Sequence, residues 1–280
     1  MSYLIPASLG FVVYNAFRLE ITEYWRDLFL KSMVEIPGPD GVYSDRIYNY
    51  DLMDLSSIWV INYSILFLIV LSFINIKWIK NKFFGIVNLG LNAFGLLVFL
   101  TMGFVVLSQL VNHYLYPNNS DYYVGSSFYF SVRYISYALI VLLLISKFIY
   151  LKQAFMQTIP RLLFVIFDSV LLITIIWILS QELITWSNIS HVNQSDKLGL
   201  SILWGVYSLV VIVLGIWKKK KHFRIGSMAF FGIILIKLFF YDLVHLNTIS
   251  KTIVFVSLGV LLLIISFLYN KYKHLITDEK

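Results

Sequence analysis

Two charged residues stand inside apolar stretches of the sequence, where an ionisable group could do chemistry. Asp168 lies in RLLFVIFDSVLLI, and Lys237 lies in GIILIKLFFYDL. If these stretches are membrane helices, an isolated charge in them costs at least about 2.5–3.5 kcal/mol, so each charge needs a partner or a route to water. A rise of ~1.5 Å per residue places the carboxylate about 10 Å and the ammonium about 12 Å from the same membrane edge. The sequence therefore predicts an Asp168–Lys237 pair.

Two interpretations of this pair remain open at the level of sequence. The pair can fix helix packing, with the variant that Lys237 extends its ammonium to the interface. It can also be a coupled proton or ion site, because ionisable groups inside a membrane often mark functional sites. Asp242 follows Lys237 by five residues, which leaves it on another face of the helix, at the outer boundary.

A second polar pattern lies in FFGIVNLGLNAFGLL, where Asn88 and Asn92 are one helical turn apart. Gly85 and Gly95 frame the two asparagines. Small residues permit close approach of helices, and asparagine side chains form hydrogen bonds between them. The stripe is therefore interpreted as a helix-packing surface rather than a substrate site.

A third pattern is a run of four cations followed by His222, at 218–222. Such a run between two apolar segments is typical of a cytoplasmic topology anchor, with contact to anionic lipid headgroups as the alternative. The cations are Lys218, Lys219, Lys220 and Lys221.

Motifs for catalysis and for tightly bound cofactors are missing from the sequence. It holds no cysteine, and its five histidines show no H-x-x-x-H or H-E-x-x-H spacing. Glycine-rich phosphate loops and nucleophile elbows are also absent. We therefore predict no catalytic residue, no metal site and no cofactor. Scattered acids and bases of the outer loops leave an enzyme as one alternative.

Composition identifies the class of protein. Of 280 residues, 59% are hydrophobic and 13% are charged, and the mean hydropathy is +0.80. These values are typical of a polytopic membrane protein. Because lipid offers no hydrogen bonds to the backbone, the spans must be helices. The predicted fold is an all-α transmembrane bundle of about eight spans: a short first helix, then 57–76, 83–110, 134–150, 162–180, 199–217, 225–242 and 252–270.

The distribution of charge predicts the orientation of the bundle. Fourteen of the 22 Lys and Arg residues fall in the connections 77–82, 146–161 and 218–224 and in the C-terminal tail, whereas twelve of the fifteen acids fall in the alternate connections. The positive-inside rule places the basic segments, and both termini, in the cytoplasm. Because the cations are topology markers, nucleic acid is excluded as a partner. The bilayer is the expected partner, with other membrane proteins as candidates.

Three segments are expected along the chain. Residues 1–19 form the short first helix, and residues 20–56 form an outer interfacial helix and loop, in which PGPDG at 37–41 makes a turn. Residues 57–280 form a seven-helix bundle with short basic loops. The basic stretches at 74–90 and 214–232 also resemble one another, as if a helical hairpin were repeated.

The last third of the chain carries a recognisable pattern. A W-x-x-Y helix (Trp204, Tyr207) precedes the basic loop, a K-L-F-x-x-D-L helix end follows it, and the last helix reads S-x-x-G-x-x-L-L-x-x-S-F-L-Y. Over residues 199–273 this resembles the C-terminal module of a large family of bacterial many-pass predicted membrane proteins of unknown function. The resemblance implies a membrane protein and no particular reaction. Family members are commonly longer, so the chain is either a short relative or a C-terminal piece.

Function is predicted only in outline. The patterns favour a non-enzymatic membrane assembly or scaffold module in the bacterial inner membrane, because the intramembrane polar groups are all explicable as helix packing. The alternatives are a transport or ion-coupling module built on Asp168 and Lys237, and an enzyme that modifies envelope lipids or glycans.

Overall fold

The fold is taken from a computed structural model that describes residues 4–37, 43–116, 122–123, 125–156, 160–190, 196–237 and 248–277. The chain divides into two compact units, Met1–Pro160 and Arg161–Lys280. We call them unit 1 and unit 2 and describe each by itself. The division falls inside the segment that the sequence predicts as one seven-helix bundle.

Unit 1 begins with one continuous helix, α1 (Leu4–Lys31), where the sequence analysis placed a boundary after residue 19. No glycine or proline occurs between residues 11 and 36. Charged side chains of the second half pair along the helix, Arg26 with Glu23 at 3.3 Å and Lys31 with Asp27 at 2.6 Å. With helix-compatible residues and no breaker, the chain has no reason to end the helix at the first charges.

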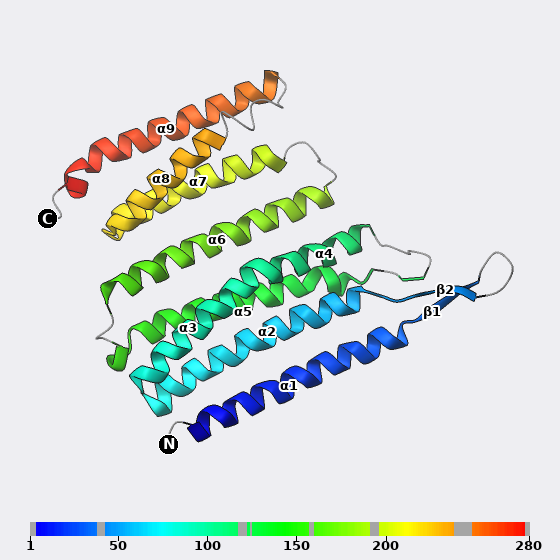
Figure 1. Cartoon of the computed structure of the whole chain (residues 1–280). Helices are drawn as coiled ribbons and strands as arrows, with labels where there is room; N and C mark the ends of the chain where they lie inside the picture. Colours follow the sequence, from blue (N-terminus) through cyan, green and yellow to red (C-terminus); the bar gives the residue numbers. More distant parts are fainter. Residues whose placement is uncertain are drawn as a thin grey trace. The chain divides into compact units, whose positions relative to one another are not determined.

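A two-stranded hairpin follows α1 and adds β-structure to a fold that was predicted as all-α. Strand β1 (Val34–Pro37) pairs antiparallel with β2 (Tyr43–Ile47), with Val34 opposite Ile47 and Glu35 opposite Arg46. The latter two side chains form an ion pair at 3.3 Å. The hairpin extends beyond the ends of the unit 1 helices (Figure 1).

The core of unit 1 forms where α2 (Asp51–Ile74), α4 (Phe104–Leu115) and α5 (Ser127–Leu151) pack together. Helix α3 (Lys82–Val98) continues through a π-helical segment (Phe99–Gly103) into α4. The α2 helix ends in a second π-helical segment, η1 (Asn75–Ile79). Apolar side chains of these helices fill the core, including Leu55, Ile58, Ile65, Phe99, Leu110, Val132 and Ile140.

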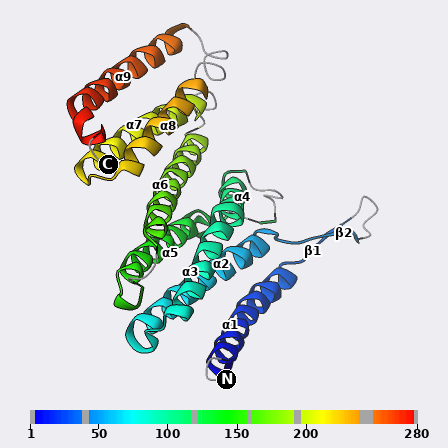
Figure 2. The same ribbon diagram turned by 60° about the vertical axis from the view of Figure 1, so that its left-hand side comes forward.

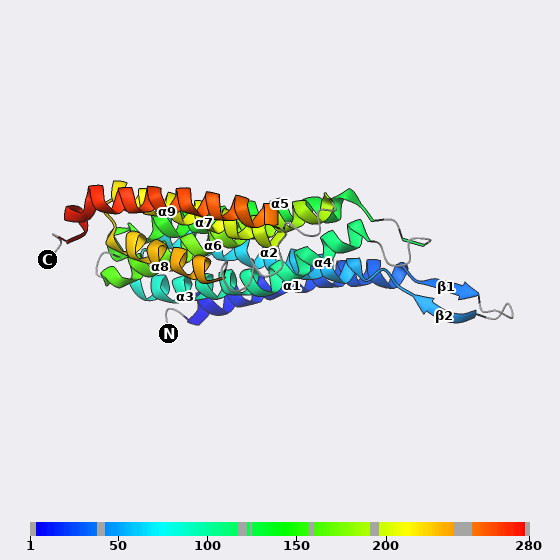
Figure 3. The ribbon, with the colours of Figure 1, turned by 90° about the horizontal axis from the view of Figure 1, so that it is seen from above.

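The described residues of unit 2 form four helices: α6 (Arg161–Ile189), α7 (Asp196–Trp217), α8 (Lys221–Lys237) and α9 (Thr248–Thr277). Helix α7 contacts each of the other three, and Figure 2 shows α8 and α9 beside it. The core of the unit gathers Ile212, Phe231, Ile234, Leu258 and Ile265. Within each unit the helices run lengthwise alongside one another (Figure 3).

The basic connections 77–82 and 218–221 share one backbone feature. Each contains a lysine in the left-handed region two residues after a tryptophan, Lys80 with φ 51° and Lys219 with φ 53°. The backbone N–H of Lys80 donates to the carbonyl of Asn75 at 2.7 Å, and that of Lys220 donates to the carbonyl of Gly215 at 2.9 Å. A left-handed residue is a common way to end a helix, and it turns the chain back for an antiparallel partner.

Membrane character is visible in the outward-facing side chains. Within the described residues, five helices are long and apolar enough to cross a membrane: Asp51–Ile79, Lys82–Leu115, Ser127–Leu151, Leu162–Ile189 and Gly199–Trp217. Large apolar side chains cover their outer surfaces, as an arrangement surrounded by lipid requires.

Candidate functional site

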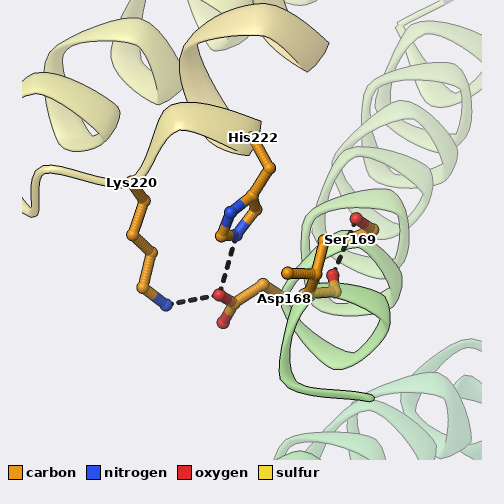
Figure 4. Close-up of polar contacts among 5 residues, drawn as sticks. Asp168, Ser169, Lys220 and His222 are labelled. Atoms are coloured by element: carbon orange, nitrogen blue, oxygen red, sulfur yellow. Dashed lines mark hydrogen bonds and ion pairs between the residues drawn. The ribbon is translucent and has the colours of Figure 1, made fainter. Parts of the chain in front are cut away.

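Asp168 is the centre of a polar cluster at the start of α6. The ammonium of Lys220 donates to Asp168 Oδ2, and Nε2 of His222 lies 3.0 Å from the same oxygen (Figure 4). The side chain of Asp168 is 15% exposed, against 40% for Lys220 and 28% for His222. Ser169 takes no part, because its hydroxyl donates to the carbonyl of Val165 at 2.9 Å. Asp168 thus holds the basic loop between α7 and α8 against α6.

Close packing of the α7–α8 turn places the loop within reach of Asp168. A Cβ atom on Gly215 would lie 2.9 Å from Cγ of Arg224 and 3.0 Å from its backbone nitrogen. Glycine at this position therefore lets the start of α8 lie directly against the end of α7. Of the four lysines in the run, Lys220 is bonded to Asp168, while Lys218, Lys219 and Lys221 are exposed.

Lys237 lies at the other end of α8 and has different partners. Its ammonium donates to Oγ of Ser201 at 2.7 Å and lies 5.3 Å from the ring centroid of Trp204. Ser201 is near the first residue of α7, whereas Asp168 is near the first residue of α6. Because α6 and α7 are antiparallel, those positions are at opposite ends of unit 2. The structure does not bring Asp168 and Lys237 together.

Asp168 and Lys237 lie at different depths because α8 starts earlier than the sequence predicts. The helix begins at Lys221, four residues before the boundary predicted from hydropathy. Four residues add about 6 Å of depth, and Lys237 is the last described residue of the helix. Asp242, together with Leu238, Phe239 and Leu243, lies outside the described residues.

The W-x-x-Y residues connect α7 to α6. The indole N–H of Trp204 donates to Oγ of Ser180 at 2.8 Å, and the hydroxyl of Tyr207 donates to the carbonyl of Leu172 at 2.7 Å. From the first contact to the second, the residue number rises on α7 and falls on α6, so the two helices are antiparallel. Both contacts satisfy polar groups that would otherwise lie unbonded in apolar surroundings.

Asn88 and Asn92 lie in a buried polar cluster of unit 1. Nδ2 of Asn88 donates to Oγ of Ser72 on α2 at 2.9 Å, and Nδ2 of Asn92 donates to Oδ1 of Asn88 at 2.7 Å. The ammonium of Lys147 on α5 donates to the same Ser72 oxygen at 2.6 Å. Four residues from three helices thus form a connected network, and each of them is at most 5% exposed.

Sequence reasoning missed Lys147, which was assigned to a basic connection. The residue lies inside α5 and is 5% exposed. A signal was available, because Lys147 lies four residues after Leu143 and three before Tyr150, and both of these are buried. This spacing places all three on one face of a helix.

Tyr150 and Asn75 form a second buried contact beside this network. Nδ2 of Asn75 donates to the hydroxyl of Tyr150, and both side chains are fully buried. Asn75 Oδ1 accepts from the backbone N–H of Asn81 at 3.1 Å, and Asn81 in turn caps α3 by accepting from Phe84 N at 3.1 Å. One asparagine therefore links the end of α2, the start of α3 and the last turn of α5.

Polar groups also meet at the opposite end of unit 1. Nδ1 of His113 lies 2.5 Å from Oδ1 of Asp51. The hydroxyl of Tyr123 lies 2.6 Å from the carbonyl of Ser32 and 3.0 Å from that of Ile47. Burial raises the pKa of Tyr123, so the hydroxyl stays a donor. No group of three or more His, Cys, Asp or Glu side chains that could hold a metal ion occurs among the described residues.

A comparison with known protein families covers residues of both units. The model of the family described as "Predicted membrane protein (DUF2339)" matches residues 42–272. The chain belongs to this family. Membership in a family of predicted membrane proteins, expected from residues 199–273, is confirmed, and the match covers most of the chain rather than its last quarter.

The DUF2339 match includes the α2–α5 network of unit 1 as well as the Asp168 cluster of unit 2. No curated protein and no solved structure matches the chain. The family description gives membrane residence and no reaction, so the function has to be argued from the contacts themselves.

Proposed function

We propose that this DUF2339 protein is a non-enzymatic assembly or scaffold module of the bacterial inner membrane. One observation supports the proposal: several polar contacts within the membrane-compatible helices join one helix to another. Asn88 bonds Ser72, Trp204 bonds Ser180, and Asp168 bonds the α7–α8 loop. Polar groups used this way specify helix packing.

A topology of eight spans with both termini in the cytoplasm belongs to the same proposal. The five long apolar helices would be joined by α1, α8 and α9. The exposed lysines of the loop at 218–221 would then face the cytoplasmic leaflet, where they could contact anionic headgroups at about 1 kcal/mol each. Cysteines placed singly in this loop and in the β1–β2 hairpin would test the orientation with an impermeant thiol reagent.

The assembly role is tested by cross-linking in the native membrane. A photoreactive residue would replace Trp177 or Trp217, which are 46% and 73% exposed, and a matched variant would carry it at the fully buried Ile140. We expect discrete protein adducts from the exposed positions and none from the buried one. Flux or substrate turnover by the purified chain in vesicles would defeat the proposal.

A transport or ion-coupling module is the second candidate. The observation that favours it is the burial of Lys147 beside Ser72 and Asn88, because charged residues within membrane helices often line ion paths. The chain contains no cysteine, so Ser72→Cys and Asn92→Cys can be compared with Leu96→Cys, a buried apolar control. Labelling of the first two by a small impermeant reagent would support a water path, and equal protection of all three would oppose it.

A further inference from the structure

Among the described residues, the end of unit 1 at which α2 finishes and α3 begins carries cations without acids. We call it the basic end of unit 1, and its cations are Lys77, Lys80, Lys82, Lys147 and Lys152. From residue 55 to residue 160 the sequence contains one acid, Asp121, and Asp121 lies outside the described residues. The described residues between 55 and 156 therefore offer no carboxylate to neutralise Lys147.

Lys147 differs from the other four cations because it is buried. Lys77, Lys80, Lys82 and Lys152 are exposed to solvent or headgroups, whereas Lys147 is 5% exposed. Its ammonium has one hydroxyl acceptor, Ser72 Oγ, and lies 4.9 Å from the ring centroid of Tyr150. A buried charge with neutral partners alone is unfavourable unless a counter-charge accompanies it.

Lys147 and Asn88 both donate to Ser72 Oγ, and the surrounding hydrogen bonds fix the orientation of these donors. Ser72 donates its own proton to the carbonyl of Leu68 at 2.7 Å, so its oxygen accepts from both Lys147 and Asn88. Asn92 donates to Oδ1 of Asn88, which turns the NH₂ of Asn88 toward Ser72. An ammonium has three N–H groups, so Lys147 keeps N–H groups beyond the one given to Ser72, whereas the amide of Asn88 also bonds the hydroxyl of Tyr150.

We propose that Lys147 forms a binding site for a small monovalent inorganic anion at the basic end of unit 1. The anion supplies the negative charge that the described residues around Lys147 lack, and it accepts hydrogen bonds from the ammonium. The exposed lysines of the same end raise the local concentration of anions. This site goes beyond the assembly role and does not depend on it.

Packing around the site restricts the size of the ligand. Tyr150 and Met156 are fully buried beside it, and a Cβ on Gly85 would lie 2.8 Å from Sδ of Met156 and 3.2 Å from the Tyr150 hydroxyl. A phosphate group with its three or four oxygens fits poorly between such close neighbours. A chloride-sized ion is the ligand that this packing favours.

The experiment uses the full chain in neutral detergent at constant ionic strength, with gluconate replaced stepwise by chloride. We expect a saturable rise of about 2–4 °C in the thermal midpoint, because a ligand that binds the folded state alone stabilises it. Lys147→Met should abolish the rise. Lys152→Met removes the same charge from an exposed position of the same end and should retain it.

A direct measurement of chloride binding tests the proposal even if the Lys147→Met variant does not fold. Equilibrium dialysis with radioactive chloride should show saturable binding to the unaltered chain and displacement by nitrate. No saturable binding, or an equal midpoint rise in Lys147→Met, would overturn the site. A Lys147-dependent rise caused by phosphatidylglycerol nanodiscs and not by chloride would assign the anion to a lipid headgroup and overturn the inorganic ligand.

Discussion

The basic ends of the two units share a turn but neutralise charge in different ways. Trp78 and Lys80 in unit 1 match Trp217 and Lys219 in unit 2, and both tryptophans are more than 70% exposed. In unit 2 the loop lysine Lys220 meets the carboxylate of Asp168. In unit 1 the buried Lys147 meets the hydroxyl of Ser72, which also accepts from Asn88, and no carboxylate takes part in these contacts.

The difference shows that the same helical hairpin can carry two kinds of polar contact. Asp168 and Lys220 are partly exposed, so their attraction is screened and contributes little to stability. Asn88, Ser72 and Lys147 are almost fully buried, so each unmade hydrogen bond there is costly. Unit 1 should therefore be the more sensitive of the two to polar and packing substitutions at its basic end.

The largest expected effect is on the buried aromatic of unit 1. Tyr150→Ala should lower the free energy of unfolding by about 3–5 kcal/mol, because Tyr150 is fully buried against Met156 and bonded to Asn75. Trp78→Ala, at an exposed position of the same end, should change it little. Unfolding in a denaturing detergent measures both, and equal losses would remove the distinction between buried and exposed aromatics.

Close packing of the unit 2 turn gives the next largest effect. Gly215→Ala should cost about 1–3 kcal/mol, because its new methyl group would press on the backbone of Arg224. Gly226→Ala is the control on the following helix, where a Cβ meets nothing within 4 Å. Thermal midpoints of the two variants should differ clearly. A stable Gly215→Ala protein would show that the turn is looser than described.

The charge cluster of unit 2 should give a smaller effect. A double-mutant cycle of Asp168→Asn with Lys220→Met should show a coupling of up to about 1 kcal/mol, because Lys220 is 40% exposed. The same cycle with Lys237→Met should be additive, since Lys237 bonds Ser201 at the other end of the unit. Coupling of Asp168 to Lys237 instead would restore the pair that the sequence predicts.

The smallest change in stability is expected from glycine substitutions at the left-handed lysines of the two basic turns. Lys80→Gly and Lys219→Gly should each stabilise the protein by about 0.5–1 kcal/mol, because both lysines have φ near +50° and glycine has no Cβ to strain there. Lys82→Gly, at the first position of α3, should not stabilise it. Chemical denaturation of the three variants makes the comparison, and unequal gains from the two turns would argue against a shared geometry.

Much of the helical arrangement could be predicted because lipid restricts the backbone so strongly. The apolar run at 57–76 falls within α2 and the start of η1, the run at 199–217 falls within α7, and the clusters of lysine mark the turns between helices. Asn88 and Asn92 were found by their spacing of one turn. By contrast, the β1–β2 hairpin was missed, because four- and five-residue strands outside the membrane produce a weak sequence pattern.

The sequence by itself determined the class of the protein, its membrane residence and its family. Those conclusions depend on composition, span length and local motifs, which need no knowledge of neighbours. Tertiary structure alone decided which polar groups meet. Asp168 contacts Lys220 and Lys237 contacts Ser201 because the start and direction of each helix set the depth of its side chains. The course of α5 likewise buries Lys147, which the sequence does not distinguish from the other cations of its basic segment.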